Sequence, residues 1–218
     1  MAKRKLIGTT GDDYLHALDD TRTIIGGEGD DILVGNAADN VLRGNAGEDT
    51  ILAGGGKDKV LGGDDADTVR GGTGHDRLDG GAGNDTLYGN AGRDVLKGGD
   101  GFDTLDGGGG ADRLNGGADS DLLTGGGGSD VFVFNGVEAE GDFVTDFTQG
   151  ADTFDFSAVA GGSFISSDPF SAGGAFELRA TDDGTNTLIE ADVDGDGAVD
   201  ATVTVAGVHT LTDADFVL

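Results

Sequence analysis

The chain has no cysteine, no tryptophan, one proline and one methionine among its 218 residues. The lack of cysteine excludes disulfide bridges and thiolate metal sites. No apolar run approaches the ~18 residues of a membrane-spanning helix. After the basic residues 3–5, the only apolar residues before Gly8 are Leu6 and Ile7, whereas a signal peptide needs an apolar stretch of about 7–15 residues. The sequence therefore predicts no Sec-type signal.

Positive charge is also scarce. Lys and Arg number 13 against 42 Asp and Glu, which leaves a formal net charge of −29. Such a charge disfavours binding to nucleic acid or anionic membranes and favours cations as partners. The hydrophobic content of 36% and the 45 glycines would suit a disordered chain. A single proline, however, is unusual for a disordered linker.

A period of nine residues runs from Gly8 to Val133 and fits fourteen nonads without insertion or deletion. The first position is Gly in twelve nonads, and the second is Gly or Asn in twelve, the residues that best tolerate a left-handed backbone. The eighth position is apolar in all fourteen, from Leu15 to Phe132. This constant phase argues against a flexible glycine-rich linker and indicates a repeat fold.

The sixth position of the nonads is mostly aspartate. In the odd-numbered nonads it is always aspartate: Asp13, Asp31, Asp49, Asp67, Asp85, Asp103 and Asp121. In the even-numbered nonads the aspartates are Asp58, Asp76, Asp94, Asp112 and Asp130. The two exceptions, Arg22 and Asn40, both lie at the start of the even series, beside the degenerate nonad 17–25. This clustering predicts an irregular first coil.

The pattern matches the G-G-x-G-x-D-x-U-x repeat, and residues 8–133 resemble the RTX (repeats-in-toxin) family of hemolysin-type calcium-binding repeats. The resemblance implies an all-β fold, a parallel β-roll followed by a small β-rich capping domain. In such a roll the first six residues of each nonad turn and the last three form a short strand. Two nonads make one coil, so the sixth-position aspartates of odd and even nonads lie on opposite edges.

Stacked strands lie about 4.7–4.9 Å apart, so each edge holds a column of carboxylates. Two unit charges about 5 Å apart repel by about 3 kcal/mol at an effective dielectric constant of ~20. Calcium accepts 6–8 oxygen ligands and relieves this repulsion. The acidic turns enclose gaps for about ten Ca2+ ions, with weaker or missing sites beside Asn40 and Arg22. Folding is expected to depend on calcium, because one modest apolar side chain per nonad makes a thin core.

The resemblance also implies the ligands of each ion. They are the second- and fourth-position carbonyls and the aspartate of one turn, with the first- and third-position carbonyls and the aspartate of the next stacked turn. The glycines assigned in this way are Gly27, Gly29, Gly54, Gly56, Gly63, Gly72, Gly74, Gly81, Gly83, Gly99, Gly101, Gly108, Gly110, Gly117 and Gly126.

One face of the expected roll carries an unusual set of cations. Successive strands from even-numbered nonads each contribute one basic residue at an outward position: Arg43, Lys59, Arg77, Lys97 and Arg113. These charges either relieve the acidity of the chain or form a track for an anionic, alginate-like polysaccharide, whose sugar repeat of about 5 Å would match the strand spacing. Calcium-binding modules of secreted alginate-modifying enzymes look similar.

Residues 134–218 lose the period and resemble the C-terminal domain of serralysin-type secreted proteases. The motifs that carry this resemblance are "GDFVTDF", "GADTFDFSAV" and "GVHTLTDADFVL". We expect these residues to cap the roll after a lead-in at 1–7 and the repeats at 8–133. The acidic and apolar tail, residues 215–218, resembles the signal of proteins exported by type I (ABC transporter) systems, which implies a secreted, extracellular protein that folds in external calcium.

Two further sites are weaker expectations. The stretch "DVDGDGAVD" begins like an EF-hand loop, with Asp192, Asp194, Asp196 and Asp200 as candidate ligands. The expected closing Glu is replaced by Val203, so an acidic β-turn is the alternative. By resemblance, Asp142 closes the last odd-edge site after the repeats.

No catalytic constellation is expected in this chain. There is no H-E-x-x-H motif, so the zinc site of the serralysin proteases is lacking. The three histidines are scattered, and the acid pairs are periodic, which singles none out for acid–base work. Two functions stay open, a calcium-driven folding and secretion module or a polysaccharide-binding module. A weaker alternative is the C-terminal part of a larger secreted hydrolase or epimerase.

Overall fold

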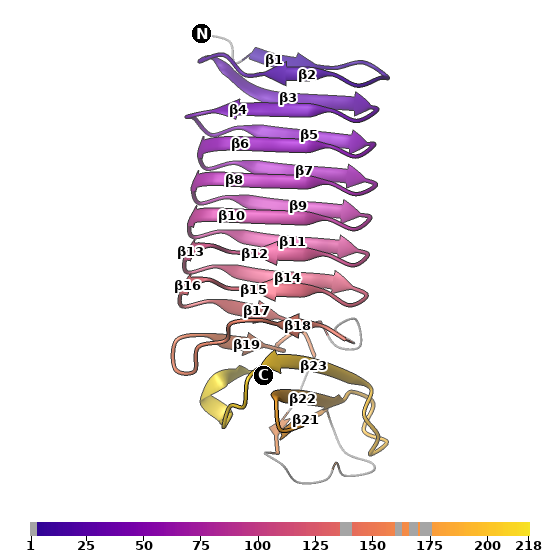
Figure 1. The fold of residues 1–218 in the computed structure, drawn as a ribbon, viewed down its shortest axis with the longest axis vertical. Coiled ribbons are helices and arrows are strands. Elements are labelled where there is room, and N and C mark those ends of the chain that lie inside the picture. The colour runs from indigo at the N-terminus through magenta and orange to yellow at the C-terminus, as the bar shows by residue number, and fades with distance from the viewer. Residues whose placement is uncertain (1–3, 136–140, 160–162, 166–169, 171–175) are drawn as a thin grey trace.

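The computed structural model describes residues 4–135, 141–159, 163–165, 170 and 176–218. Two parallel sheets face each other along the long axis, and the chain passes from one to the other in every half coil (Figure 1). The fold is thus all-β and is the parallel β-roll predicted from the sequence. No helix in the described part of the chain is long and apolar enough to cross a membrane.

The even sheet, named for the nonads that supply most of its strands, has ten strands. In spatial order they are β1 (Arg4–Ile7), β3 (Thr21–Glu28), β5 (Val41–Ala46), β7 (Lys59–Asp64), β9 (Arg77–Ala82), β11 (Val95–Asp100), β14 (Arg113–Ala118), β17 (Val131–Val133), β19 (Thr153–Asp155) and β24 (Phe216–Val217).

The odd sheet has fourteen strands. Its main path is β2 (Tyr14–His16), β4 (Ile32–Asn36), β6 (Thr50–Gly56), β8 (Thr68–Gly74), β10 (Thr86–Gly92), β12 (Thr104–Asp106), β15 (Leu122–Thr124), β18 (Phe143–Val144), β23 (Ala201–Ala206), β22 (Asn186–Asp192), β21 (Glu177–Asp182) and β20 (Ser163–Phe164). The short strands β13 (Gly109–Gly110) and β16 (Gly127–Gly128) lie beside this path.

The register confirms that one coil is two nonads. Thr86 pairs with Thr104 and Val95 with Arg113, so each residue lies beside its equivalent one coil later. The eighth-position side chains stack inside the roll and are 0–1% exposed from Ile24 to Phe132. Leu15, in the first coil, is only partly buried, because no earlier coil covers it.

Most strands of the repeats are longer than the three residues expected for each nonad, although β2, β12, β15 and β17 have three. β8 runs from Thr68 to Gly74 and therefore includes the glycine-rich start of the next nonad. Gly74 pairs with Gly56 of the preceding coil, so the ladder continues into the turn. A Cβ on Gly74 would overlap the carbonyl oxygen of Gly56. The lack of side chains thus lets the backbones stack closely enough to keep their hydrogen bonds beyond the expected strand.

Both sheets continue past the last nonad. β18 pairs with β15 and β19 pairs with β17, in parallel, as if they were further coils. Beyond them, β21, β22 and β23 form an antiparallel meander, and β24 pairs with β19. β22 lies within the alternating run "TNTLIEADV" and β23 within the alternating run "ATVTVAGV". The C-terminal segment thereby covers the lower end of the roll in Figure 1.

Candidate metal centres

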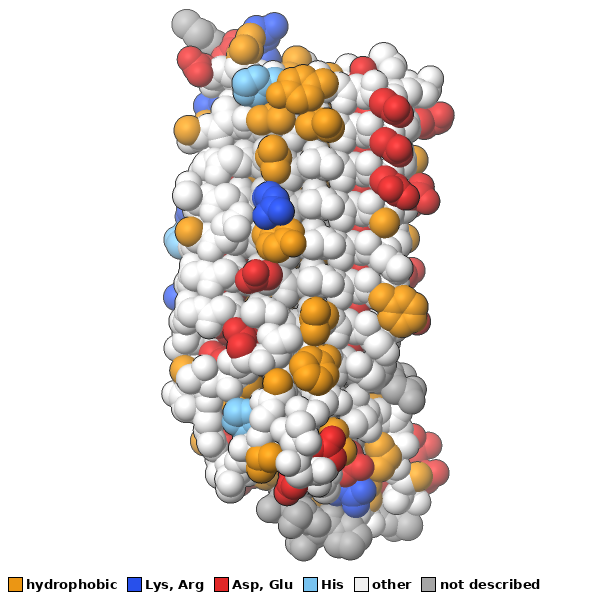
Figure 2. Space-filling model, viewed as in Figure 1, with side chains coloured by type: hydrophobic (Ala, Val, Ile, Leu, Met, Phe, Trp, Pro, Cys, Tyr) orange, Lys and Arg blue, Asp and Glu red, His pale blue; other side chains and the backbone are white. Residues whose placement is uncertain are grey.

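The sixth-position aspartates form two columns, one on each edge of the roll. In each column the backbone N–H of one aspartate donates to Oδ1 of the aspartate 18 residues later, at 2.7–2.9 Å. This ladder gives every carboxylate of a column the same orientation. Exposed acidic side chains also gather along the edge of the upper coils at which β3 turns into β4 and β5 into β6 (Figure 2).

The second oxygen of these carboxylates has no hydrogen-bond partner, except at Asp13, where it accepts the N–H and the hydroxyl of Thr9. The buried free atoms are the Oδ2 atoms of Asp31, Asp49, Asp58, Asp67, Asp76, Asp85, Asp94, Asp103, Asp112, Asp121 and Asp130. An unsatisfied buried polar atom costs about 1–3 kcal/mol, and more if it is charged. Eleven of them in the described part of one small protein are an unusual number, and each offers an acceptor to a cation.

The free oxygens face the backbone of the following coil. A Cβ on Gly26 would overlap Oδ2 of Asp31 and would lie 2.8 Å from the carbonyl oxygen of Gly44, one coil later. The free carboxylate oxygen and a first-position carbonyl therefore share one small space, which a side chain at Gly26 would fill. All fifteen glycines assigned as ligands from the sequence have a positive φ, such as +98° at Gly29, so these positions favour glycine.

Burial raises the pKa of these carboxyls, the ladder hydrogen bond opposes the rise, and neighbouring carboxylates add to it. The pKa is raised to about 8 for Asp67, to about 7 for Asp58 and Asp103, and to about 6 for Asp49. Without a cation, the carboxyls with the highest pKa, such as Asp67, are thus partly protonated near neutral pH.

The donor set fits calcium. It consists of carboxylate and carbonyl oxygens only, without nitrogen or sulfur, which is the choice of a hard cation that accepts 6–8 oxygens. The columns lie where the sequence predicts them. Eleven of the twelve repeat aspartates are 0–3% exposed; the exception is Asp13, which belongs to the open first coil.

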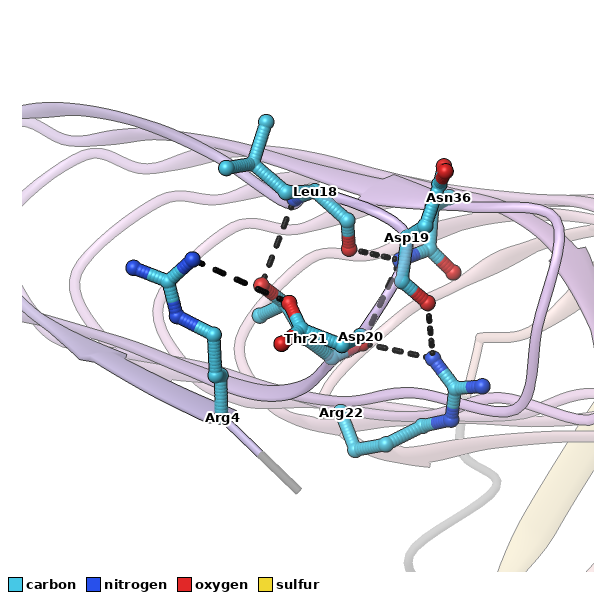
Figure 3. Close-up of polar contacts among 7 residues, drawn as sticks. All are labelled: Arg4, Leu18, Asp19, Asp20, Thr21, Arg22 and Asn36. Carbon is cyan, nitrogen blue, oxygen red and sulfur yellow. Dashed lines mark hydrogen bonds and ion pairs between the residues drawn. The ribbon is translucent and has the colours of Figure 1, made fainter. Parts of the chain in front are cut away.

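The first turn of the even edge replaces acceptors by donors (Figure 3). The Arg22 guanidinium donates to the carbonyl oxygens of Asp19 and Thr21, at 3.0 and 2.9 Å. Asn36 Nδ2 donates to the carbonyls of Leu18 and Thr21, at 2.8 and 3.2 Å.

Asn40 Nδ2 also donates to the Thr21 carbonyl, at 3.1 Å. The carbonyls of Leu18 and Asp19, at the second and third positions of their nonad, are ones that the repeat would turn toward a cation, and here an amide and a guanidinium satisfy them. This gives a physical reason for the weak or missing site expected beside Arg22 and Asn40.

Each column is extended by one aspartate beyond the repeats. On the odd edge, Asp121 N–H donates to Asp142 Oδ1 at 2.9 Å, which agrees with the position expected for Asp142. On the even edge, Asp130 N–H donates to Asp152 Oδ1 at 2.9 Å. Sequence reasoning missed Asp152 because the separation is 22 residues and not 18. The signal was present, since "GADTF" at 150–154 repeats the Gly-x-Asp-x-apolar half of a nonad.

The EF-hand-like stretch forms a compact acidic turn. Ligand atoms of Asp192, Asp194 and Asp200 lie within 4.8 Å of one another, and Asp192 is fully buried. Asp196, the fourth candidate, is not part of this group. The two oxygens of Asp192 accept the backbone N–H groups of Gly195 and Gly197 at 2.7 and 2.9 Å, so the turn also satisfies itself.

The five basic residues lie exposed on successive strands of the even sheet, but not in one line. Lys59, Arg77 and Arg113 share one column, and Arg43 and Lys97 share the next. Two of the five pair with acids, Lys97 with Asp79 at 4.0 Å and Arg113 with Asp155 at 2.7 Å.

Comparison with known proteins identifies the repeats. The family model of the RTX calcium-binding nonapeptide repeat (4 copies) matches residues 25–60, 61–96 and 97–132. No curated protein sequence is similar enough to the chain to count as a match.

Solved structures similar to the chain include two repeat subunits of an epimerase and a lipase. The AlgE6R2 subunit of the mannuronan C5-epimerase of Azotobacter vinelandii is 28% identical, over 66% of this chain and 89% of its own, with a TM-score of 0.44. The AlgE6R3 subunit of that epimerase is also 28% identical, over 72% and 80%, with a TM-score of 0.36.

The extracellular lipase LipA of Serratia marcescens is 18% identical, over 87% of this chain and 40% of its own length, with a TM-score of 0.39. The identification itself rests on the family model and on the nonad pattern that it matches. Through these repeats, the chain belongs to the RTX family of calcium-binding proteins.

Proposed function

We propose that this chain is a calcium-dependent folding module of a secreted protein, which is exported unfolded and folds when its carboxylate columns bind about ten extracellular Ca2+ ions. The observation that carries the proposal is the set of eleven buried Oδ2 atoms without a partner. Bound calcium would supply the partner that these oxygens lack and would compensate their negative charge.

The residues of the chain explain why folding would depend on the ion. Each coil buries two eighth-position side chains of modest size, such as Val60 and Val69, and this thin core must offset the repulsion of stacked carboxylates. Without cations, the free oxygens remain desolvated and unpaired. At low calcium the unfolded chain, whose carboxylates are hydrated, is therefore favoured.

Export through a type I system is proposed from the tail. Asp215 and Phe216 are 3% and 8% exposed in the folded chain, and β24 pairs with β19. A tail held in this way is accessible to an exporter only while the chain is unfolded. Removal of residues 215–218 should abolish export in a bacterial host that expresses a type I exporter, measured as the secreted fraction.

The folding proposal is tested by titrating the calcium-free chain with Ca2+. We expect far-UV circular dichroism to change from disordered to β-sheet, and bound calcium to reach about ten ions per chain by atomic emission after dialysis. Mg2+ at the same concentration is the control, because it demands octahedral geometry and retains its waters. A chain that is fully folded without calcium and binds none would contradict the proposal.

A second candidate function, binding of an anionic polysaccharide, is favoured by the basic residues of the even sheet. Five exposed cations on successive strands are a marked exception in a chain of net charge −29. The sheet places their side chains at intervals of about 4.7–4.9 Å along the roll, near the sugar repeat of an extended glycan.

The glycan proposal is tested with Arg77→Ser and Lys97→Ser in one variant. We expect salt-sensitive binding to alginate by the calcium-loaded wild type, and loss of binding in the variant with calcium-induced folding intact. Arg70→Ser is the matched control, since Arg70 lies on the odd sheet over the Tyr88 ring, 4.1 Å from its centroid. Binding that survives in the double variant would contradict this function.

Two finer proposals remain. The acidic turn at Asp192, Asp194 and Asp200 is proposed as an additional calcium site, so Asp194→Asn should bind one calcium ion fewer per chain than wild type.

As a weaker alternative, the module is proposed to be the C-terminal part of a larger secreted hydrolase or epimerase. An upstream catalytic domain in the natural open reading frame would support this.

A further inference from the structure

The last carboxylate of the even column has a free oxygen although no nonad follows it. Asp130 is 1% exposed, and its Oδ2 has no hydrogen bond. Gly125 is the first residue of the same nonad, and a Cβ on it would lie 2.7 Å from Asp130 Oδ2. In the preceding even nonad, a Cβ on Gly107 would lie 2.8 Å from Asp112 Oδ2. The Asp130 carboxylate therefore has the same orientation as the one before it. A Cβ on Gly107 would also lie 2.7 Å from the Gly125 carbonyl oxygen of the next coil, whereas at Gly125 the Phe132 ring, at 3.1 Å, is nearer than any atom of the next turn.

That next turn, residues 147–152, supplies a carboxylate in the matching place. Asp152 is 5% exposed and accepts the Asp130 N–H through Oδ1 at 2.9 Å, compared with 2.8 Å for the Asp112–Asp130 step. Its Oδ2 accepts the Thr148 N–H at 2.7 Å. Gly150, two residues before it, has φ +80°, as the fourth-position glycines do. The turn thus places its aspartate where a repeat turn would, although it lies outside the nine-residue period and is closed differently, by the Asp152 N–H that donates to the Thr148 carbonyl at 2.9 Å.

We propose that Asp130 and Asp152 together hold a calcium ion, so that a turn outside the nonad repeat carries one more oxygen-ligand metal site. This inference rests on the proposed function, because it extends the same chemistry by one turn. A carboxylate offers about four lone-pair sites, so the hydrogen bonds to Asp152 leave capacity for a cation. The unpartnered Asp130 oxygen is the second ligand.

The position of this site has a consequence for the C-terminal segment. The Phe147 ring stacks on Phe154 with centroids 4.4 Å apart and meets the His209 ring edge-on at 5.6 Å. Gln149 Nε2 donates to the Thr210 carbonyl at 2.5 Å. The turn that carries Asp152 thus holds residues 209–210, far along the chain. A metal ion between Asp130 and Asp152 would tie the end of the roll to the segment that covers it.

The test compares the full chain with Asp152→Asn and with the control Asp213→Asn. Both changes remove one negative charge from the C-terminal segment, but Asp213 is exposed and outside the columns. We expect Asp152→Asn to bind one calcium ion fewer per chain than wild type, measured by atomic emission after equilibrium dialysis, and Asp213→Asn to bind the full number. An unchanged count in Asp152→Asn would overturn the inference.

A second measurement needs no variant and remains informative if Asp152→Asn fails to fold. In hydrogen–deuterium exchange of the wild type, peptides covering 147–156 and 208–217 should gain protection on addition of calcium. Protection of 147–156 that is independent of calcium would overturn the inference. A wild type that binds no calcium would contradict the proposed function itself, whereas a full wild-type count without any loss in Asp152→Asn contradicts only this site.

Discussion

At the scale of single residues, one atom of each repeated aspartate decides the chemistry. Oδ1 continues the hydrogen-bond ladder along the column, as in the 2.8 Å contact from Asp31 N–H to Asp49, while Oδ2 is free and buried. An asparagine in the same place changes both interactions. Asn40 Oδ1 lies against Gly35 and accepts the Asn36 N–H at 2.9 Å, while its Nδ2 takes the ladder position and donates to the Thr21 carbonyl of the preceding coil at 3.1 Å.

Replacing Asn40 by Asp should create a calcium site. The Asn40 N–H already donates to Asp58 Oδ1 at 2.7 Å, so the column is in register at this step. We expect Asn40→Asp to bind one additional calcium ion per chain, and to need a higher calcium concentration than wild type to fold, because a carboxylate would face the Thr21 carbonyl. Bound metal and far-UV circular dichroism during a calcium titration measure the two effects. Asn84→Asp, an equal charge change at an exposed turn position, should leave the calcium count unchanged.

Replacing a turn glycine by alanine should destabilise the roll where the backbones of two coils are in contact. Gly74→Ala places a Cβ against the Gly56 carbonyl at φ +144°, and an L-residue with a left-handed backbone costs about 1–2 kcal/mol before any overlap is counted. We expect a loss of at least this size in the free energy of unfolding, measured by denaturant titration in saturating calcium. Gly127→Ala, which has nothing within 4 Å, is the control, and equal losses in both variants would contradict the close-stacking argument.

At the scale of elements, the two ends of the roll are built differently. At the start, β1 and β2 leave Ile7 and Tyr14 63% and 67% exposed, and guanidinium and amide donors satisfy the first even turn. At the other end, phenylalanines take the place of the Leu, Ile and Val side chains of the repeats and pack together beside the antiparallel meander. Phe154 stands at the centre of this group, with its ring 5.9 Å from Phe132 and 5.8 Å from Phe216.

Truncating this central ring should release the last strand. We expect Phe154→Ala to reduce the free energy of unfolding by about 3–5 kcal/mol and to expose β24, which pairs with β19. Denaturant unfolding in calcium and proteolysis near residue 216 measure the two effects. Phe102→Ala, which truncates a ring that is 60% exposed, should change the stability little. A Phe154→Ala protein as stable as this control would show that the phenylalanines do not hold the end of the roll.

At the scale of the whole molecule, acidity and calcium act on the same carboxylates in opposite ways. Burial raises the pKa of column aspartates such as Asp49, to about 6, and Asp67, to about 8, above the usual 3.8. The calcium-free folded roll therefore binds more protons than the unfolded chain between about pH 4 and pH 8, and its stability falls as pH rises through that window. Calcium needs the deprotonated form, so its affinity falls as pH decreases.

The pH dependence of stability should consequently reverse with calcium. Without calcium, where the unfolded chain is favoured, we expect a larger folded fraction at pH 5 than at pH 7.5, because protons neutralise the columns. In saturating calcium, the unfolding temperature should be lower at pH 5 than at pH 7.5, because protons compete for the ligands. Far-UV circular dichroism measures the folded fraction without calcium, and scanning calorimetry measures the unfolding temperature with calcium. The same direction with and without calcium would contradict a coupled role for the columns.

The nine-residue period carries most of the predictable information. The buried row from Ile24 to Phe132 and the aspartate columns follow from position alone, because coils of constant length place equal positions at equal depths. Asp152 escaped this reasoning because its turn is separated from the preceding one by 22 residues, so a period of nine cannot find it. The basic residues were expected as one row and occupy two neighbouring columns, because the seventh and ninth positions flank the inward one.

The amino-acid sequence by itself determined the roll, its glycine-rich turns and the two acidic edges, since each nonad encodes its own glycine bends, inward side chain and carboxylate. Only the tertiary structure decided how the repeat begins and ends. Arg22 and Asn36 reach carbonyls of the first even turn, and Asp152 and Phe216 complete the opposite end across gaps of 22 and 62 residues from their partners Asp130 and Phe154. Such contacts depend on the path of the chain through space, which a local repeat does not encode.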